Sequence, residues 1–233
     1  MEHTTQPNLW AARIIDYMRS HQYNVSTTSG EINIVYLEGL NPDFTGNSDA
    51  LDGWNDLSVL IDHLPDGTPI LLHSAVATSE PGKASTFSLQ AKRLGGVARF
   101  PCSPDPLAQQ TAWSMGYHKQ ARQGTMHPAL VQHAKVPIMV YRDRDDNGKR
   151  TGDPIRIAHG LNQHSTFPGY TAGPVGNYSA GCLVRRWWVD HLAWIAMLKN
   201  DARYQANERF LFTTTNIAGD HFLLMVEQAC GRL

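Results

Sequence analysis

The sequence predicts an α+β fold with a mainly β core, built around a sheet with a few helices packed on it. Segments rich in β-branched and aromatic residues recur along the 233 residues, and clusters of Gly, Pro, Asn and Asp separate them. The chain is 42% hydrophobic and 18% charged, which is ordinary for a globular protein with a substantial core. It contains no internal repeat and no low-complexity linker.

The first part of the chain is expected to form a helix, a strand and a loop. Residues 9–20 carry apolar side chains at helical spacing just after a proline. Residues 31–38 are β-branched and aromatic, which predicts a strand, and residues 39–55 have the composition of a loop. A short helix is expected next, through Trp54, Leu57, Leu60 and Ile61.

The rest of the chain alternates between strand-like and helical patterns. The helix expected at residues 186–199 has two apolar stripes, which predicts that it is mostly buried against the sheet. We expect strands at residues 69–77, 110–122, 136–142, 154–158 and 209–217, and helices near 86–94 and 220–229.

The segment between two of these strands has features of a calcium loop. Asp143, Asp145, Asn147 and Gly148 occupy the first, third, fifth and sixth places of such a loop. The twelfth place is Pro154 instead of a bidentate Glu, and basic neighbours dilute the negative charge. A hairpin turn closed by Asn147 and Gly148 explains the same residues, and we prefer that interpretation.

Two further groups of polar residues raise questions of chemistry. The acidic residues Glu38, Asp49, Asp52 and Asp56 have no pattern that fixes them on a common face, so we expect them to act as helix caps and in solvated loops. Glu80 is assigned to a turn, and Cys102 to a loop without a surrounding motif. His118, His127 and His133 raise the question of zinc, which usually requires three or four ligands, but none of them shows an HExxH-type pairing. We therefore expect polar surface or cleft-lining histidines and no metal site.

Cys182 follows the small residues Ser179, Ala180 and Gly181, and His164 lies fourteen residues before that Ser. A cysteine nucleophile reacts as its thiolate, so it needs a base or a cation nearby. Gly181 can adopt a positive φ, and such a turn would aim the amides of Gly181 and Cys182 at a developing oxyanion. Taken alone, these residues also fit a small buried hydrophobic cysteine, which is the commoner role.

The spacing resembles the catalytic motif of the L,D-transpeptidase family: a His, a gap in the mid-teens, then Ser/Thr-X-Gly-Cys. Members of this family use the cysteine to attack peptide bonds in the stem peptides of bacterial peptidoglycan. The resemblance implies that Cys182 is the nucleophile and His164 the base, and that Ser179 and Gly181 shape the turn. The matching motif covers only residues 164–184.

The chain departs from the family motif at two positions that concern substrate binding. Ala180 stands where the family commonly has His, and Val184 stands where it often has Arg, with Arg185 one place later. Arg185 and Arg156 are candidates to pair with a substrate carboxylate, and a solvated surface position is the alternative for both. His159 competes with His164 for the role of base, but it lies outside the family's gap, so we place it among the substrate-binding residues.

The resemblance also implies a domain organisation. It predicts an L,D-transpeptidase-like catalytic core over residues 110–233, with residues 1–109 forming an N-terminal extension packed on that core. One continuous domain is the alternative. The family resemblance implies no metal or other cofactor.

The charge and the apolar runs bear on partners and location. The formal net charge of −1 gives no argument for nucleic acid as a partner. No run of eighteen apolar residues predicts a membrane-spanning helix. Residues 1–7 are polar and lack the features of a signal peptide, so we expect synthesis in the cytoplasm and phage-mediated or other release to the cell wall.

The leading hypothesis is a cysteine-dependent hydrolase of peptidoglycan stem peptides, an endolysin-like murein peptidase of bacterial or bacteriophage type that acts through a thioester. One alternative is an L,D-transpeptidase that forms or exchanges peptide links. A second alternative is a wall-binding or phage structural module without catalysis. The presence of both reactive residues favours an enzyme.

Overall fold

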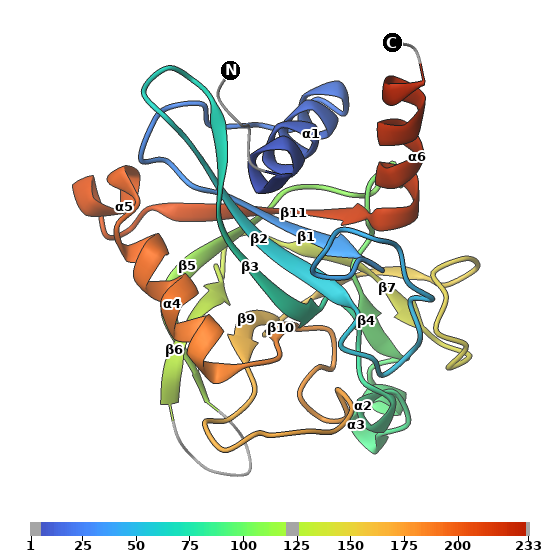
Figure 1. Ribbon diagram of the computed structural model, residues 1–233. Coiled ribbons are helices and arrows are strands. Elements are labelled where there is room, and N and C mark those ends of the chain that lie inside the picture. The colour runs from blue at the N-terminus through green and yellow to red at the C-terminus, as the bar shows by residue number, and fades with distance from the viewer. Residues whose placement is uncertain (1–5, 120–125, 232–233) are drawn as a thin grey trace.

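The computed structural model describes residues 6–119 and 126–231, and at its centre eight strands close into a barrel (Figure 1). These strands are β1 (Asn33–Glu38), β2 (Asp56–His63), β3 (Pro69–Thr78), β5 (Thr111–Lys119), β6 (Met126–Gln132), β9 (Asn162–Ser165), β10 (Leu183–Arg185) and β11 (Leu211–Ala218). They pair in the order β1, β11, β5, β6, β9, β10, β3, β2, and β2 pairs back with β1. The pairs β1–β11 and β9–β10 are parallel, whereas the other pairs are antiparallel. The predicted α+β class with a mainly β core is confirmed.

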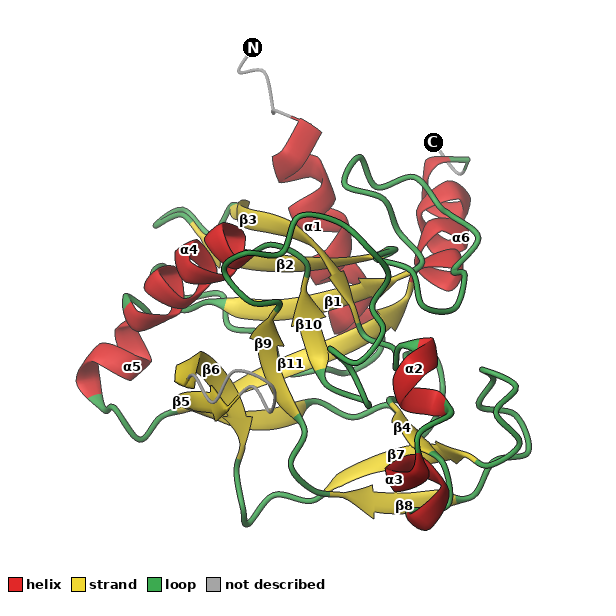
Figure 2. Cartoon of the chain, turned by 90° about the horizontal axis from the view of Figure 1, so that it is seen from below, coloured by secondary structure: helices red, strands yellow, loops and turns green. Residues whose placement is uncertain are grey.

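A small sheet and six helices complete the described part of the chain. The small sheet contains β4 (Val97–Arg99), β7 (Ile138–Asp143) and β8 (Ile155–Ala158), in that order, and lies beside the barrel (Figure 2). In Figure 1, α1 and α6 lie along one side of the barrel, and α4 and α5 lie at another. The helices are α1 (Gln6–Ser20), α2 (Lys83–Thr86), α3 (Leu89–Arg93), α4 (Trp188–Lys199), α5 (Ala202–Ala206) and α6 (Gly219–Cys230).

Strand β1 separates the two hydrophobic cores of the molecule. Ile34 and Tyr36 face the barrel interior and share a core with residues of β5 and β11. Val35 and Leu37 face outward and pack in a second core with apolar residues of α1 and α6. Because both faces of β1 are buried, its sequence is continuously apolar from Ile34 to Leu37, with polar residues only at its two ends.

The short helix predicted through Leu57, Leu60 and Ile61 is wrong, because these residues lie on strand β2. Leu57 and Ile61 belong to the outer core and Leu60 to the inner one. The alternation of polar and apolar residues from Asp56 to Val59 breaks at Leu60, because the strand is buried on both faces except at Asp62. Its apolar spacing therefore fitted a helix.

Most other elements lie within a few residues of their predicted positions. The predicted helix near 86–94 is split into α2 and α3, and β4, β6, β9 and β10 were not predicted. The strand predicted at 110–122 is β5, and its last predicted residues lie outside the described part of the chain. Strands β7 and β8 form the predicted hairpin, but residues 144–154 join them as a long loop and not as a tight turn at Asn147 and Gly148.

The barrel crosses the boundary that was expected at residue 109. Strands β1, β2 and β3 come from the predicted N-terminal extension, and they pair with β11 and β10 from the predicted catalytic core. Residues 33–78 therefore supply part of the barrel wall and do not pack on a finished core. Within the described ranges, no helix has the length and the apolar character needed to cross a bilayer.

His63 at the end of β2 is an unfavourable feature of the outer core. Its side chain is 1% exposed, and neither ring nitrogen has a hydrogen-bond partner. Burial, assisted by Arg19, lowers the pKa of His63. The unfolded chain therefore takes up a proton below about pH 6.5 that the folded chain does not, so stability is lost as the pH falls.

We predict that His63→Leu stabilises the protein by about 1 kcal/mol at pH 8, because it removes two buried unsatisfied polar atoms. The expected rise in Tm is roughly 2–4 °C by thermal unfolding, and it should be larger at pH 5. The exposed His159→Leu is the matched control and should leave Tm unchanged. A lower Tm for His63→Leu at both pH values would show that the imidazole has a favourable role.

Candidate active site

The parallel pair β9–β10 brings His164 and Cys182 to one face of the barrel wall. Figure 2 shows β9 beside β10. Val184 lies opposite His164 and Leu183 lies opposite Gln163, so the same register puts Cys182, the residue before β10, opposite Asn162. Side chains alternate between faces along a strand, which puts Cys182 and His164 on the same side. Strand spacing and rise place their Cα atoms about 8 Å apart on a diagonal.

The turn before β10 is built by Ser179 and Gly181. Ser179 Oγ donates to the Cys182 carbonyl at 2.8 Å and accepts from the Gly181 amide at 3.1 Å. Gly181 has a φ of +124°, and a Cβ there would lie 2.6 Å from the Cβ of Ala98 on β4. Both the conformation and the contact with Ala98 therefore require glycine at this position.

The Cys182 thiol is desolvated and protonated. Burial raises the pKa of Cys182 to about 11, and the neighbouring Asn162 backbone amide opposes that shift only in part. The activated thiolate that a cysteine nucleophile requires is therefore not the resting form at neutral pH. The resting site contains a neutral thiol.

His164 is held as a neutral imidazole with one nitrogen unoccupied. Its side chain is 2% exposed, and its Nδ1 donates to the Ser165 carbonyl at 2.9 Å. This bond puts the proton on Nδ1, so Nε2 keeps a lone pair; Nε2 is buried and has no hydrogen-bond partner. Burial, followed by the neighbouring His118, lowers the pKa of His164 well below its ordinary value.

Two of the three histidines considered for zinc surround His164. His118 on β5 lies directly opposite His127 on β6, and their ring centroids are 5.3 Å apart. The His118 ring stacks on His164 with a centroid distance of 3.9 Å, and His127 lies 5.7 Å from His164. His133 forms a local contact with the Lys135 amide instead.

Arg185 is buried and Arg156 is exposed, although both were candidates to bind a substrate carboxylate. Arg185 is fully buried on the other face of β10, where its guanidinium donates to Tyr36 and Ser58 and to His191 Nδ1 at 3.0 Å. The expected pairing of Arg185 with a substrate carboxylate is therefore corrected: its guanidinium belongs to the barrel interior. Arg156 is exposed on β8 and donates to the Ile155 carbonyl.

His159 lies just after β8, and its side chain is exposed. It belongs to neither the histidine cluster nor the turn around Cys182. Among the predicted site residues, the structure gathers Cys182, His164, Ser179 and Gly181 on one part of the barrel, with Asn162 and His118 as neighbours that the sequence analysis did not assign to the site.

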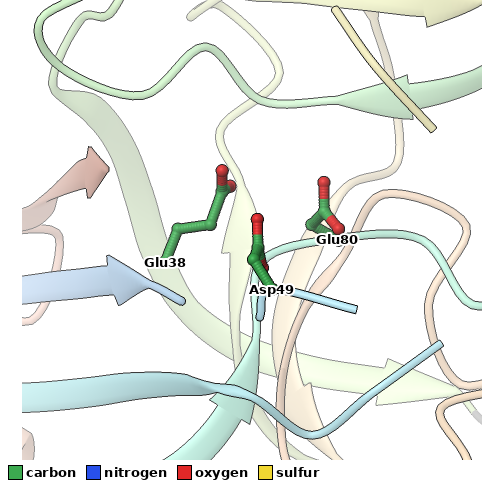
Figure 3. Close-up of side chains that lie close together, drawn as sticks. All are labelled: Glu38, Asp49 and Glu80. Carbon is green, nitrogen blue, oxygen red and sulfur yellow. The ribbon is translucent and has the colours of Figure 1, made fainter. Parts of the chain in front are cut away.

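A second polar cluster lies at one end of the barrel. Figure 3 shows Glu38, Asp49 and Glu80 with their carboxylates directed toward one another. Glu38 and Asp56 lie on paired ends of β1 and β2, and both are buried, whereas a solvated position was predicted. Of the four acidic residues assigned to caps and loops, Asp52 has that role, because its carboxylate accepts from the backbone amides of Lys83 and Gly176.

Two arginines hold this cluster together. Arg150 forms a bidentate ion pair with Glu38, and Arg99 donates to Glu80 at 2.9 Å and to Asp143 at 2.8 Å. Burial alone would raise the pKa of Glu38, but Arg150 holds it below the ordinary value. Burial and the negative charge of Glu38 raise the pKa of Glu80 to about 8.

The pKa values of Asp56 and Asp49 are raised by the same two causes as that of Glu80. Burial and Glu38 raise the pKa of Asp56 to about 7 and that of Asp49 to about 6. Asp56 is the more enclosed of the two, and its carboxylate accepts from the backbone amides of Gly39 and Ser79. An open cavity of about 650 Å³ reaches Glu38, Asp49 and Arg150.

In the described ranges, two groups of three carboxylates have oxygens within 4.8 Å of one another. One group is Glu38, Asp49 and Glu80, and the other is Asp143, Asp145 and Asp153. The second group belongs to the loop that was compared with a calcium site. There the Asp143 carboxylate accepts from Arg99 and from the amides of Asn147 and Gly148. These contacts organise the loop within the protein itself.

Comparison of the chain with protein-family models, with curated proteins and with solved structures found no match.

We predict that Cys182 reacts slowly with iodoacetamide at pH 7, about 300-fold more slowly than a free cysteine with a pKa of about 8.5, because its thiol pKa is about 11. The rate should rise about tenfold per pH unit up to pH 9.5 without a plateau. Peptide mapping of the labelled protein measures this site separately from Cys102. Fast labelling at pH 7 that levels off above that pH would show a resting thiolate.

Proposed function

We propose that this protein is a cysteine-dependent acyl-transfer enzyme that hydrolyses peptide bonds in peptidoglycan stem peptides. The observation that carries the proposal is the placement of Cys182 and His164 on one face of adjacent parallel strands, with the Nε2 lone pair of His164 unoccupied. A nucleophile and a base on neighbouring strands are the minimum machinery for covalent acyl transfer. The resemblance of the His164 to Cys182 motif supports the choice of peptidoglycan as substrate.

The proposed reaction has two stages. Cys182 Sγ attacks the carbonyl carbon while its proton passes to His164 Nε2, and the C–N bond then breaks as the amine leaves with that proton. In the second stage a water molecule gives a proton to Nε2 and attacks the thioester, which releases the acid and restores the thiol. The Ser165 carbonyl keeps Nδ1 protonated throughout, so Nε2 is the nitrogen that exchanges protons.

The resting structure requires a rearrangement before the first stage. No hydrogen bond joins the thiol to His164, because His164 Nε2 has no partner. Catalytic hydrogen bonds are often long in the free enzyme and shorten in the complex with substrate. The proposed reaction therefore requires the Cys182 thiol and His164 Nε2 to come together when substrate binds.

The donor to the oxyanion differs from the one that the sequence predicted. The Gly181 amide is used inside the turn, where it donates to Ser179 Oγ. The Asn162 backbone amide lies beside the Cys182 sulfur and favours its thiolate, so it is a donor next to the reacting atom. We assign oxyanion stabilisation to the amides of Asn162 and Cys182.

We predict that Cys182→Ala and His164→Ala each lower the release of fragments from purified peptidoglycan by about 10³-fold or more, because each removes one half of the nucleophile–base pair. Mass spectrometry of the soluble fragments measures the rate and identifies the cleaved bond. Cys102→Ser and His159→Ala are the matched controls and should keep most of the activity. Full activity of a folded Cys182→Ala protein would end the nucleophile assignment.

The final acceptor is proposed to be water, and a defined stem peptide with and without a labelled D-amino acid tests this. Hydrolysis predicts free, shortened stem peptide in both reactions. Efficient incorporation of the labelled amine, with little shortened product, would identify a transpeptidase. Binding of peptidoglycan without any covalent change would identify a wall-binding or structural module.

A further inference from the structure

The strongest unassigned feature near Cys182 is the ring of His118. It comes from β5, which β6 separates from β9 in the barrel. The His118 and His164 rings are nearly parallel, with an interplanar angle of 6° and a centroid distance of 3.9 Å. His118 is half-buried, whereas His164 is 2% exposed, so His118 lies on the more accessible side of the pair.

Asn162 connects His118 to the thiol. Its side-chain Nδ2 donates to His118 Nδ1 at 2.9 Å, and its backbone amide lies beside the Cys182 sulfur, where it lowers the thiol pKa. Its Oδ1 accepts from the Gln132 amide on β6 at 3.3 Å, which fixes the direction of the amide group. His118 therefore contacts the base by stacking and the nucleophile's neighbour by a hydrogen bond.

Two further imidazoles lie near His164 and His118. His127 from β6 and His191 from α4 approach the cluster, and His191 bonds to the Pro128 carbonyl and to Arg185. Burial lowers the pKa of His118, His127 and His191 as it does that of His164. The cluster contains no carboxylate that would stabilise a positive charge on His164.

We propose that His118 is a positioning residue of the Cys182 site: its ring supports the imidazolium that forms when His164 accepts the thiol proton, and it holds Asn162 beside the sulfur. The inference rests on the proposed function. His118 repels a charge on His164 only when His118 is itself protonated, and burial lowers the pKa of His118, so its ring is neutral at neutral pH. A cation is attracted to the face of a neutral aromatic ring, and the attraction is largest where water is excluded. The stacked ring thus takes the place of the carboxylate that orients and supports the histidine base of a Ser-His-Asp triad.

The test compares two variants of similar size, His118→Phe and His118→Leu. Both remove the bond to Asn162 and both cover His164, but only Phe retains an aromatic face. We expect the pKa of His164, followed by NMR titration of its ring carbon signals, to be about one unit higher in the Phe variant than in the Leu variant. Hydrolysis of a defined stem peptide should differ in kcat by about tenfold in the same direction, with a similar KM.

Two further variants complete the test. Asn162→Ala removes the side-chain link but keeps the backbone amide, and it should lower kcat while leaving the pKa of His164 near that of the unmodified protein. Tyr117→Leu is the matched control, because Tyr117 is the exposed neighbour on the opposite face of β5, and it should change neither quantity.

The outcomes separate this inference from the proposed function. Equal His164 pKa values and equal kcat in the Phe and Leu variants would overturn the role of His118. A pKa difference between the two variants in a protein that cleaves no stem peptide would support the stacking role and refute the proposed activity. The NMR measurement does not depend on catalysis, so the two failures cannot be confused.

Discussion

The parallel pairing of β9 with β10 is the constraint on which the candidate site depends. Neighbouring parallel strands cannot be joined by a tight turn, because the chain must return to the same end of the sheet. Here residues 166–182 make that return, and they are rich in Gly, Pro, Ser and Thr. The sequence spacing between His164 and Cys182 is therefore the length of a crossover connection, and the register then puts both side chains on one face.

The charged cluster at the barrel end supports the turn formed by Ser179 and Gly181, and the connection runs through Ala98. Arg99 is anchored by Glu80 and Asp143, and the preceding residue, Ala98, packs against Gly181. The Ala98 amide also donates to the Ala180 carbonyl at 3.4 Å. Buried ion pairs contribute little net stability, but removing one partner is costly, by about 3–5 kcal/mol. The cluster thus fixes the small sheet in one position against the segment that presents Cys182.

The sequence was sufficient for the parts of the fold that follow from local patterns. Strands β1, β3 and β11 and helices α1, α4 and α6 have clear apolar patterns, and they were predicted close to their observed bounds. Strand β2 was not, because burial on both faces breaks the alternation at Leu60 and leaves Leu57, Leu60 and Ile61 at a spacing that also fits a helix. The turn at Ser179 and Gly181 was predicted because it depends on residue types next to one another in the chain.

Features that depend on closure of the barrel could not be predicted in this way. Glu38, Asp49 and Glu80 come from three separate segments, and only the fold shows that they converge. His118 was considered only together with His127 and His133, as a possible zinc ligand, because the sequence does not show that β6 lies between β5 and β9 in the barrel. The burial of Arg185 follows from the alternation along β10, which could not be assigned before the strand was known.

The central claim is that Cys182 forms a covalent acyl intermediate with a peptidoglycan stem peptide. Rapid acid quenching of the reaction followed by intact-protein mass spectrometry tests it most directly. The account predicts a transient mass increase equal to the acyl part of the peptide, mapped to Cys182 and removed by hydroxylamine as a thioester is. Cleavage of the peptide at an undiminished rate with no adduct at any time, or an adduct mapped to another residue, would contradict it.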